Sequence, residues 1–285
     1  MTTVAESLRE AARSLHSCSD SPRLDAELLL GKVLSLSRSG LVARGNEPVA
    51  SESQEAFASL VEQRCRGTPV AYLTGTREFW SLALAVSPAV LVPRPETEVL
   101  VDLALQRLPH ERATTVLDLG TGSGAIALAI ASERPLAQVT GSDISPAALD
   151  IAKKNSRDLR LSRIEWLLGS WFSPVLGRRF DMIVANPPYI ASADPALKKL
   201  KAEPAIALCD GVTGLEALAA IASAAPAHLH DGGWLLLEHG SDQAPDVAQM
   251  LRRHGFSSIR SHPDFSGKLR VTLGTKHSPH QEPPP

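Results

Sequence analysis

Apolar residues in the first part of the chain recur at the spacing of helices. The stripe of the first candidate helix consists of Val4, Leu8, Ala11, Ala12 and Leu15. A second segment opens with Ser21 as a cap and Pro22 in the first turn, and a third opens with Ser51 or Ser53 as its cap. These patterns predict a small helical domain over residues 1–75.

The pattern then changes from helical spacing to alternation. Residues 77–93 alternate between apolar and polar side chains, are rich in strand-forming residues and contain the pair Ser87 and Pro88. Alternation of this kind predicts two antiparallel strands, with the Ser-Pro pair as their turn. We therefore place a β-hairpin linker at residues 76–94, between two domains.

From residue 95 onward, strand-like runs alternate with helix-like stretches. Strands are predicted at residues 114–120, 137–144, 164–171, 180–188 and 232–240, with two more within 256–274. Helices are predicted at residues 97–108, 124–135, 145–159 and 215–229. This alternation implies an α/β fold with a mostly parallel, doubly wound sheet. The fold class is thus a Rossmann-like domain over residues 95–276 beside a small helical domain, with a Pro-rich, disordered tail over residues 277–285.

Composition and charge narrow the possible functions. The chain has 285 residues, 44% of them hydrophobic, which is enough material for the cores of two domains. Its formal net charge of −2 and pI near 6.5 leave no global basic surface for nucleic acid. The N-terminus lacks the pattern of a signal peptide, and no run of about 18 apolar residues occurs. We expect a cytoplasmic protein that binds neither DNA nor a membrane.

Cysteines and histidines give no sign of disulfides or of a metal. Cys18, Cys65 and Cys209 form no close pair in the sequence, which predicts reduced, buried thiols. The nine histidines include no His-Glu-x-x-His pattern. We expect no metal site, and a monomeric protein.

A glycine-rich loop joins the first predicted strand of the α/β domain to its helix. The loop is Gly120-Thr121-Gly122-Ser123-Gly124. Glycines at such a turn permit positive φ and let the backbone approach a ligand, while the N–H groups at the helix start attract a carboxylate or a phosphate. A tight turn made for structural reasons alone is the alternative interpretation.

Asp143 ends the second predicted strand, about 20 residues beyond the glycine loop. In nucleotide-binding sheets, an acidic side chain at this place accepts hydrogen bonds from a ribose diol. Capping the next helix is the alternative role, but Ser145 ahead of Pro146 already supplies that cap. The spacing therefore predicts that a nucleoside binds between the loop and Asp143.

The alternating glycines depart from the dinucleotide-binding pattern. The loop resembles the motif of class I methyltransferases that use S-adenosylmethionine as cofactor. This resemblance implies that Trp171, just after the third predicted strand, contacts the adenine, because an indole ring can stack on a purine. A role as a core or covering residue is the alternative for Trp171.

The motif Asn186-Pro187-Pro188-Tyr189 follows the fourth predicted strand, at the edge where open α/β sheets bind ligands. Prolines fix φ and donate no hydrogen bond, so the turn is stiff. The side-chain carbonyl of Asn186 and the main-chain carbonyl of Pro187 then form two acceptors at a fixed separation. The alternative interpretation is a Pro-Pro strand stop beside a buried tyrosine.

Two fixed acceptors suit a planar NH₂ group, such as a carboxamide or an exocyclic base amine. Such nitrogens are poor nucleophiles because their lone pair is delocalised. Holding both N–H bonds positions the nitrogen for attack on a sulfonium methyl group and favours the positive charge that develops there. Tyr189 can lie against the planar group and exclude water. The motif therefore predicts methylation of a conjugated nitrogen without naming the acceptor.

Several segments occur in the order found in bacterial release factor glutamine methyltransferases, the HemK/PrmC family. They are TPVAYLTGTREFW, VLVPRPETEVLV, LDLGTGSGAIALAIA, VANPPYI, EPAIALCDGVTGLEAL and LLLEHG. The chain is similar to this family over almost its whole length. The resemblance implies a helical substrate-recognition domain, a β-hairpin and a methyltransferase domain. It also implies a substrate: the Gly-Gly-Gln glutamine of class I peptide chain release factors, methylated on its side-chain amide nitrogen.

The resemblance also implies roles for particular residues. The loop residues 120–124, Asp143, Trp171 and Asn186 would bind S-adenosylmethionine. The glutamine would be framed by Asn186, Pro187, Pro188 and Tyr189, of which Asn186, Pro187 and Tyr189 would act in catalysis. The segment Pro93–Glu98 resembles a wall of the same site, with a capped helix start as the alternative. Glu238 and His239 resemble supports of the site more than catalysts.

Two rival functions stay open at this point. A DNA adenine-N6 methyltransferase uses a related Asn/Asp-Pro-Pro-aromatic motif after base flipping, but no basic groove and no base-reading domain is visible in the sequence. A non-catalytic binding protein that kept the cofactor fold is the other rival. The intact glycine loop and the intact Asn186 argue against it.

Overall fold

The computed structural model describes residues 2–277, and the chain divides into two compact units, Met1–Thr76 and Arg77–Pro285. The division falls within the first strand of the predicted hairpin, so the rest of the hairpin belongs to the second unit. The predicted domain boundaries at residues 75, 94 and 276 stay predictions. The predicted tail, apart from His277, lies outside the described residues.

The first unit consists of short helices around one apolar core. Its elements are α1 (Val4–Ser14), η1 (Leu15–Ser17), α2 (Pro22–Leu34), α3 (Arg38–Ala43), α4 (Ser51–Cys65) and α5 (Val70–Thr74). The predicted stripe of α1 is buried at Val4, Leu8 and Ala11, with Leu15 following it, and these side chains pack with those of α2 and α4. Helices α3 and α5 are additional to the three segments predicted from spacing.

The helix caps of this unit differ from the prediction at α4. Ser21 stands at the N-cap of α2, but its hydroxyl makes no cap bond. Ala50 is the N-cap of α4, so the prediction of Ser51 or Ser53 as the cap is wrong. The preceding Val49 N–H donates to the Thr2 carbonyl at 2.9 Å, which holds the chain extended up to Ala50. The helix therefore begins directly at Ser51.

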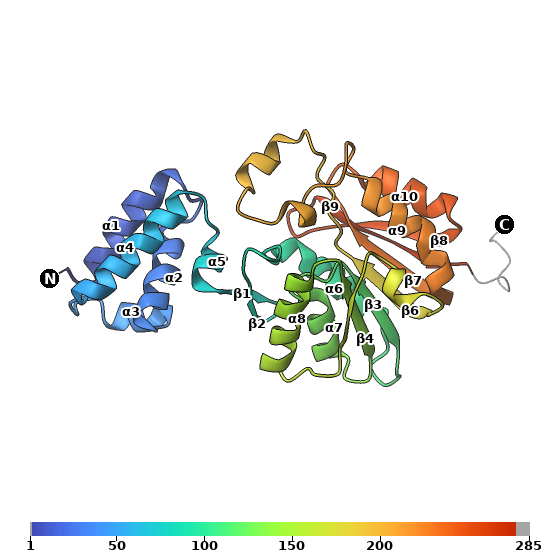
Figure 1. The fold of residues 1–285 in the computed structure, drawn as a ribbon, viewed down its shortest axis with the longest axis horizontal. Coiled ribbons are helices and arrows are strands. Elements are labelled where there is room, and N and C mark those ends of the chain that lie inside the picture. The colour runs from blue at the N-terminus through green and yellow to red at the C-terminus, as the bar shows by residue number, and fades with distance from the viewer. Residues whose placement is uncertain (1, 278–285) are drawn as a thin grey trace. The chain divides into compact units, whose positions relative to one another are not determined.

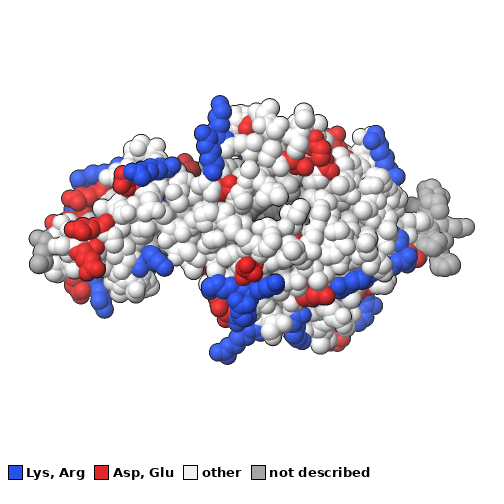
Figure 2. Space-filling view, in the orientation of Figure 1, with Lys and Arg blue, Asp and Glu red and all other residues white. Residues whose placement is uncertain are grey.

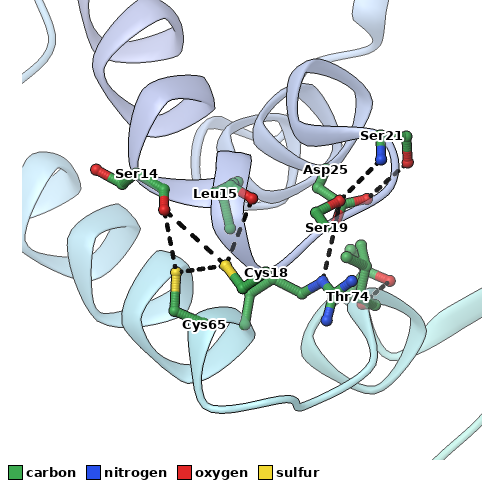
Figure 3. Close-up of polar contacts among 10 residues, drawn as sticks. Ser14, Leu15, Cys18, Ser19, Ser21, Asp25, Cys65 and Thr74 are labelled. Carbon is green, nitrogen blue, oxygen red and sulfur yellow. Dashed lines mark hydrogen bonds and ion pairs between the residues drawn. The ribbon is translucent and has the colours of Figure 1, made fainter. Parts of the chain in front are cut away.

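Two thiols that are far apart in the sequence lie side by side in this unit. Figure 3 shows Cys18 Sγ beside Cys65 Sγ, at 2.8 Å, with both thiols near the Ser14 carbonyl. Partial burial and the neighbouring thiol raise the pKa of Cys18 to about 11, which keeps it protonated near neutral pH. All three cysteines are free, but none is buried, so that part of the prediction is wrong.

The predicted β-hairpin is formed by β1 (Thr76–Phe79) and β2 (Leu82–Ala85), and all of it except Thr76 belongs to the second unit. Its turn consists of Trp80 and Ser81, with φ of 52° and 59°. Two residues at positive φ give the turn that matches the twist of two antiparallel strands. The predicted turn at Ser87 and Pro88 is therefore wrong, because that pair follows the hairpin and begins an irregular segment.

A seven-stranded sheet forms the centre of this unit (Figure 1). Its strands are β3 (Thr115–Leu119), β4 (Gln138–Asp143), β5 (Glu165–Leu168), β6 (Phe180–Ala185), β7 (Leu229–Glu238), β8 (Phe256–Pro263) and β9 (Leu269–Lys276). The order is β5-β4-β3-β6-β7-β9-β8, with β3 to β7 parallel and β9 antiparallel to both its neighbours. The predicted α/β class is confirmed.

Helices cover both faces of the sheet, as Figure 1 shows. They are α6 (Glu98–Leu105), α7 (Ala125–Glu133), α8 (Pro146–Asp158), α9 (Glu216–Ala224) and α10 (Ala244–Arg253). Val116 and Val184 of the sheet pack against α6 and α7, whereas Leu117 and Ile183 pack against α9 and α10. Alternate strand residues thus fill two separate cores, which is why these strands read as continuous apolar runs. Helix α10 is an element that the sequence analysis missed.

Short 3₁₀ helices complete the second unit. They are η2 (Pro95–Thr97), η3 (Ser173–Val175), η4 (Pro195–Lys199), η5 (Ala205–Ala207) and η6 (Ala225–His228). Within residues 2–277, none of the helices has both the length and the apolar character needed to cross a bilayer.

Candidate active site

A cavity of about 270 Å³ lies at the carboxyl ends of β3, β4 and β6. Strand β3 lies between β4 and β6, so the chain leaves β3 on one side and later returns on the other. Ligands bind at this switch point in open parallel sheets, in sites that begin at about 300 Å³. Its walls include Gly120, Gly122, Asp143, Trp171, Asn186 and Pro188. Six of the residues predicted from the sequence are therefore brought together at one cavity.

The glycine loop faces the cavity through Gly120 and Gly122. Both have positive φ, 69° and 56°. A Cβ atom on Gly122 would meet no atom within 4 Å, so the space beside this residue is open. The loop therefore presents bare backbone to whatever occupies the cavity.

The other three loop residues face inward, away from the cavity. Thr121 and Ser123 are buried, and the Thr121 hydroxyl donates to Asp118 Oδ2 at 2.5 Å. A Cβ atom on Gly124 would lie 2.9 Å from the Trp166 ring, so only glycine fits there. Only two of the five predicted loop residues line the cavity, and the other three shape the turn.

Asp118 is a residue of this site that the sequence analysis missed. It is fully buried near the end of β3, where its Oδ2 also accepts from the Ala127 N–H of α7 at 3.2 Å. Its Oδ1 has no hydrogen-bond partner among the described residues. Burial raises the pKa of Asp118 to about 7, against the lowering effect of these two hydrogen bonds. A polar residue inside the apolar run of β3 was the available signal.

Asn155 is a second missed residue, on the buried face of α8. Its Nδ2 donates to the carbonyls of Ser123 at 2.9 Å and Ala85 at 3.0 Å, and its Oδ1 accepts from the Ala85 N–H at 2.7 Å. One buried amide thus ties the glycine loop to the hairpin. The signal is its helical spacing from the buried Ala148 and Ala152.

Asp143 lies at the end of β4, against the glycine loop. Its Oδ2 accepts from the Gly122 N–H at 2.8 Å and its Oδ1 from the Ser145 N–H at 2.9 Å. Each carboxylate oxygen has a second acceptor site, so the side chain can still bind a diol. The predicted cap is confirmed, because the Ser145 hydroxyl accepts from the Ala148 N–H at 3.2 Å.

Trp171 lines the same cavity beyond β5. Its backbone has φ of 45°, unusual for a bulky residue and therefore a mark of a constrained position. The ring passes 3.7 Å from where a Cβ atom of Gly120 would lie, and it also packs against the core on the α9 side. The position suits both interpretations, a stacking surface and a cover of the core.

The Asn-Pro-Pro-Tyr motif follows β6 and is divided between the cavity and the interior. Asn186 and Pro188 line the cavity, whereas Pro187 is buried and Tyr189 does not reach the cavity wall. The Asn186 Nδ2 donates to Thr97 Oγ1 at 3.1 Å, which leaves its Oδ1 as the free end of the amide. A Thr97 contact 89 positions away in the sequence was not foreseen.

Tyr189 points toward the end of β7. Its hydroxyl donates to Glu238 Oε1 at 3.4 Å, and its main-chain carbonyl accepts from Gln243 Nε2 at 3.1 Å. Burial and the Glu238 charge raise the pKa of Tyr189 above its ordinary value, so the phenol stays protonated. The structure therefore places Tyr189 as a donor to a buried carboxyl.

Glu238 and His239 end β7 behind the motif, and both are buried. Burial raises the pKa of Glu238 to about 7, and its Oε2 has no hydrogen-bond partner within the described part of the chain. His239 Nδ1 donates to the Gly240 carbonyl at 2.8 Å, and its Nε2 accepts from the Thr272 hydroxyl at 2.7 Å. Burial lowers the pKa of His239, so the ring is neutral and both its nitrogens are used.

The segment from residue 89 to 97 forms a further side of the site. Ala89, Val90 and Leu91 line the cavity, whereas none of residues 93–98, predicted as the wall, lines it. Arg94 and Glu203 form an ion pair of 2.5 Å, with Glu203 almost wholly buried. This pair joins the segment to the residue just before a further part of the cavity lining, which consists of Pro204, Ile206, Ala207, Cys209 and Asp210. Neither wall contains a cluster of His, Cys, Asp and Glu that could hold a metal ion, and none occurs elsewhere in residues 2–277.

The fold and this site define the class of a Rossmann-like methyltransferase. The structure is similar to a methyltransferase from Pyrococcus furiosus, with a TM-score of 0.53 and 19% identity over 69% of this chain and 90% of that one. It is also similar to the hMettl16 catalytic domain, with a TM-score of 0.59 and 17% identity over 75% of this chain and 82% of that one. At these identities the likeness concerns the fold alone.

Sequence relatives identify the family within this class. The family model of the PrmC N-terminal domain matches residues 6–75, and that of the methyltransferase small domain matches residues 97–203. Release factor glutamine methyltransferases from Xylella fastidiosa and Salmonella typhimurium are 52% and 46% identical, covering 88% and 94% of this chain and 92% and 96% of theirs. One from Coxiella burnetii is 42% identical over 97% of this chain and all of its own. The chain belongs to the release factor glutamine methyltransferase family.

Proposed function

We propose that this protein methylates the side-chain amide nitrogen of the Gly-Gly-Gln glutamine in class I peptide chain release factors, using S-adenosylmethionine. The main observation in support of this function is the orientation of Asn186 at the cavity wall. Its NH₂ group is hydrogen-bonded to Thr97, which leaves its Oδ1 free to accept a hydrogen bond. The names of the relatives support the choice of substrate.

The cavity residues fit S-adenosylmethionine. Asp143 has acceptor capacity for a ribose diol, Trp171 offers an aromatic surface for adenine, and Gly122 has open space where a side chain would otherwise project. When bound, this cofactor supplies an electrophilic methyl group, which the amide nitrogen of the substrate receives in exchange for one proton. A side chain at position 122 would occupy this open space.

The motif residues would hold the substrate amide from two directions. Asn186 Oδ1 and the Pro187 carbonyl would each accept one N–H of the glutamine NH₂ group. These fixed acceptors orient the nitrogen and stabilise the positive charge that it develops, without a strong base. The Pro187 ring fixes φ and the following Pro188 restricts ψ, so together they limit the direction of the Pro187 carbonyl. Tyr189 would affect these acceptors indirectly, through its hydrogen bond to Glu238.

The remaining assignments are part of the same proposal. Substrate recognition is assigned to the helical residues 1–75, supported by the match to the PrmC N-terminal domain over residues 6–75. DNA is disfavoured as a substrate because, on the face of the second unit in Figure 2, Lys and Arg are interspersed with Asp and Glu. A cytoplasmic location and a monomeric state are further predictions, which fractionation of cells and light scattering test.

A labelling experiment tests this function. Purified protein is incubated with methyl-labelled S-adenosylmethionine and a class I release factor, with the Gly-Gly-Gln glutamine changed to Ala as the matched substrate control. We expect label in the unchanged factor alone. Label in duplex or single-stranded DNA would replace the proposed substrate, and cofactor binding without any transfer would favour the non-catalytic rival.

A further inference from the structure

We propose that Glu238 is a positioning residue which, through Thr97, sets which end of the Asn186 amide faces the substrate. This inference rests on the proposed function and deepens it. Glu238 touches neither the cavity nor the substrate amide, so its effect passes through two neighbouring side chains. The unpartnered Oε2 of a fully buried carboxyl is the observation that the fold alone leaves unexplained.

The three side chains form one line from the cavity into the interior. Asn186 lines the cavity, and its Nδ2 donates to Thr97 Oγ1 at 3.1 Å. Thr97 is 4% exposed and Glu238 is 1% exposed, so water does not compete with either. The Thr97 hydroxyl also acts on the Glu238 carboxyl and lowers its pKa, although the two do not form a hydrogen bond of normal geometry. Thr97 thus lies between the amide and the acid.

With Glu238 ionised, the hydroxyl has only one good arrangement. A carboxylate accepts hydrogen bonds and cannot donate, so the single Thr97 proton is directed toward Glu238. Thr97 Oγ1 can then only accept from Asn186, which turns the NH₂ group of the amide inward. The Oδ1 atom is left for the substrate N–H, as the two-acceptor arrangement requires.

With Glu238 protonated, the donor and acceptor roles along the line from Glu238 through Thr97 to Asn186 can reverse. The acid can donate to Thr97 Oγ1, and the Thr97 proton becomes free to donate to Asn186 Oδ1. The amide then presents its NH₂ group to the substrate NH₂ group, two donors facing each other. Protonation of Glu238 should therefore lower the rate of transfer, with no loss of the fold.

The groups around Glu238 set the pH at which it becomes protonated. Burial raises the pKa of Glu238 to about 7 and Glu96 of η2 adds to the rise, whereas Arg270 of β9 opposes it. Tyr189 and Arg94 face the same region, and the neighbouring His239 is neutral. Asp118 has a similar pKa but contacts the glycine loop, so cofactor affinity must be measured at each pH to separate the two acids.

The first test is the pH dependence of transfer in Glu238→Gln. In this isosteric variant the Tyr189 hydroxyl keeps the side-chain oxygen, so the Gln NH₂ group faces Thr97 and imitates the protonated acid at every pH. Single-turnover rates are measured from about pH 6 to about pH 8. We expect the wild-type rate to rise through this range and the variant to be flat and about tenfold to a hundredfold slower at the upper end.

Thr97 supplies the matched pair of controls. Thr97→Ser keeps the hydroxyl and should keep the wild-type pH profile, whereas Thr97→Val keeps the shape and should lose the profile. The Kd for S-adenosylmethionine, measured by calorimetry, should be unchanged in all three variants. A Glu238→Gln variant that keeps the wild-type pH profile would overturn the positioning role, while a wild type that transfers nothing to the release factor would instead overturn the proposed function.

A second measurement needs no turnover at all. The carboxyl ¹³C shift of Glu238, assigned by its loss in Glu238→Gln, is followed by NMR across the same pH range. Titration near 7, accompanied by a shift of the Asn186 side-chain NH₂ signals, is the expected result. A Glu238 that titrates like an exposed glutamate, or Asn186 signals that do not follow it, would end the proposal whatever the activity.

Discussion

Two pairs of buried acidic side chains, one pair in each unit, are held in opposite ways, although the second unit also pairs its buried Glu203 and Asp264 with arginines. In the helical unit, Asp25 Oδ2 accepts from Arg64 at 2.8 Å, and Glu27 accepts from two arginines, one at each oxygen. In the methyltransferase unit, neither Asp118 nor Glu238 is bonded to an arginine, and each keeps one oxygen without a partner among the described residues. We call the first pair closed, because arginines neutralise both carboxylates, and the second pair open, because each carboxyl keeps an oxygen without a partner in residues 2–277.

The difference also sets the charge of these groups. Burial would raise the pKa of Glu27, but hydrogen bonds from Arg38 and Arg23 outweigh burial and lower it. No such partner offsets burial at Asp118 and Glu238, whose pKa values rise to about 7. The comparison shows that one unit uses buried acids to join helices, while the other keeps two that can change charge near neutral pH beside its cavity.

The largest effect on activity is expected at Asn186, which lies at the cavity end of the line formed by Glu238, Thr97 and Asn186. Asn186→Ala removes one of the two proposed acceptors, and transfer to the release factor should fall by a factor of about 100 to 1,000 in single-turnover rate. The melting temperature should stay close to that of the wild type, because the side chain lies at the cavity wall. Near-normal turnover would contradict the two-acceptor arrangement.

Substitutions in the closed pair of the helical unit, Asp25 and Glu27, should change stability and not activity. Arg64→Leu leaves the buried Asp25 without its cation and should cost about 3 kcal/mol, as for a broken buried ion pair. Hydrogen exchange of amides in α2 and α4 measures this loss. Arg66→Leu is the control, because Arg66 and Glu62 are exposed and their pair should contribute less than about 0.5 kcal/mol. Equal losses in both variants would refute the contrast.

Gly122→Ala should separate cofactor binding from folding. The residue lines the cavity with φ of 56°, and a Cβ atom there meets nothing within 4 Å, so an added methyl group occupies open space beside the cavity wall. We expect the Kd for S-adenosylmethionine to rise about tenfold, with about 1–2 kcal/mol of backbone strain. Gly177→Ala carries the same kind of strain at φ 77°, away from the cavity, and should leave the Kd unchanged.

The smallest effect is the opposite response of the two units to pH. Asp118 and Glu238 have folded-state pKa values of about 7, above their ordinary values, so their stabilising contribution is present at low pH and is lost as the pH rises through about 7. Glu27 has a lowered pKa, so its contribution is present above its ordinary value of 4.5 and is lost as the pH falls through the lowered one.

From about pH 8 to about pH 6, the methyltransferase unit should therefore gain about 1 kcal/mol for each of its two open carboxyls. The helical unit should gain nothing from Glu27 in this range. Tryptophan fluorescence follows the unfolding of the methyltransferase unit alone, because all four tryptophans lie in it. The double variant Asp118→Asn, Glu238→Gln should lose the gain, and a gain that persists would contradict the assignment.

The strands and the cavity residues could be predicted from the sequence because their signals are local. Apolar runs such as residues 180–188 marked strands, and the positions of Gly120, Asp143 and Asn186 at or just after the ends of three strands placed them at one edge of the sheet. Parallel strands bring their carboxyl ends together, which turns spacing along the chain into proximity.

The supporting contacts could not be predicted, because they join distant segments. Thr97 and Asn186 meet across 89 positions, and Asn155 and Ala85 across 70. No periodicity encodes which buried polar group finds which partner. The hairpin turn was misplaced for a related reason, since Trp80 has a positive φ that its residue type does not suggest. Helix α10, in contrast, has a regular apolar stripe after Pro245 and could have been predicted.

Mass analysis of the release factor after reaction tests the central claim most directly. The peptide that contains Gly-Gly-Gln is fragmented after incubation of the factor with S-adenosylmethionine and either the wild type or Asn186→Ala. The account predicts one added methyl group on the side-chain nitrogen of that glutamine with the wild type, and an unmodified peptide with the variant. A methyl group on another residue, or equal modification by both proteins, would contradict it.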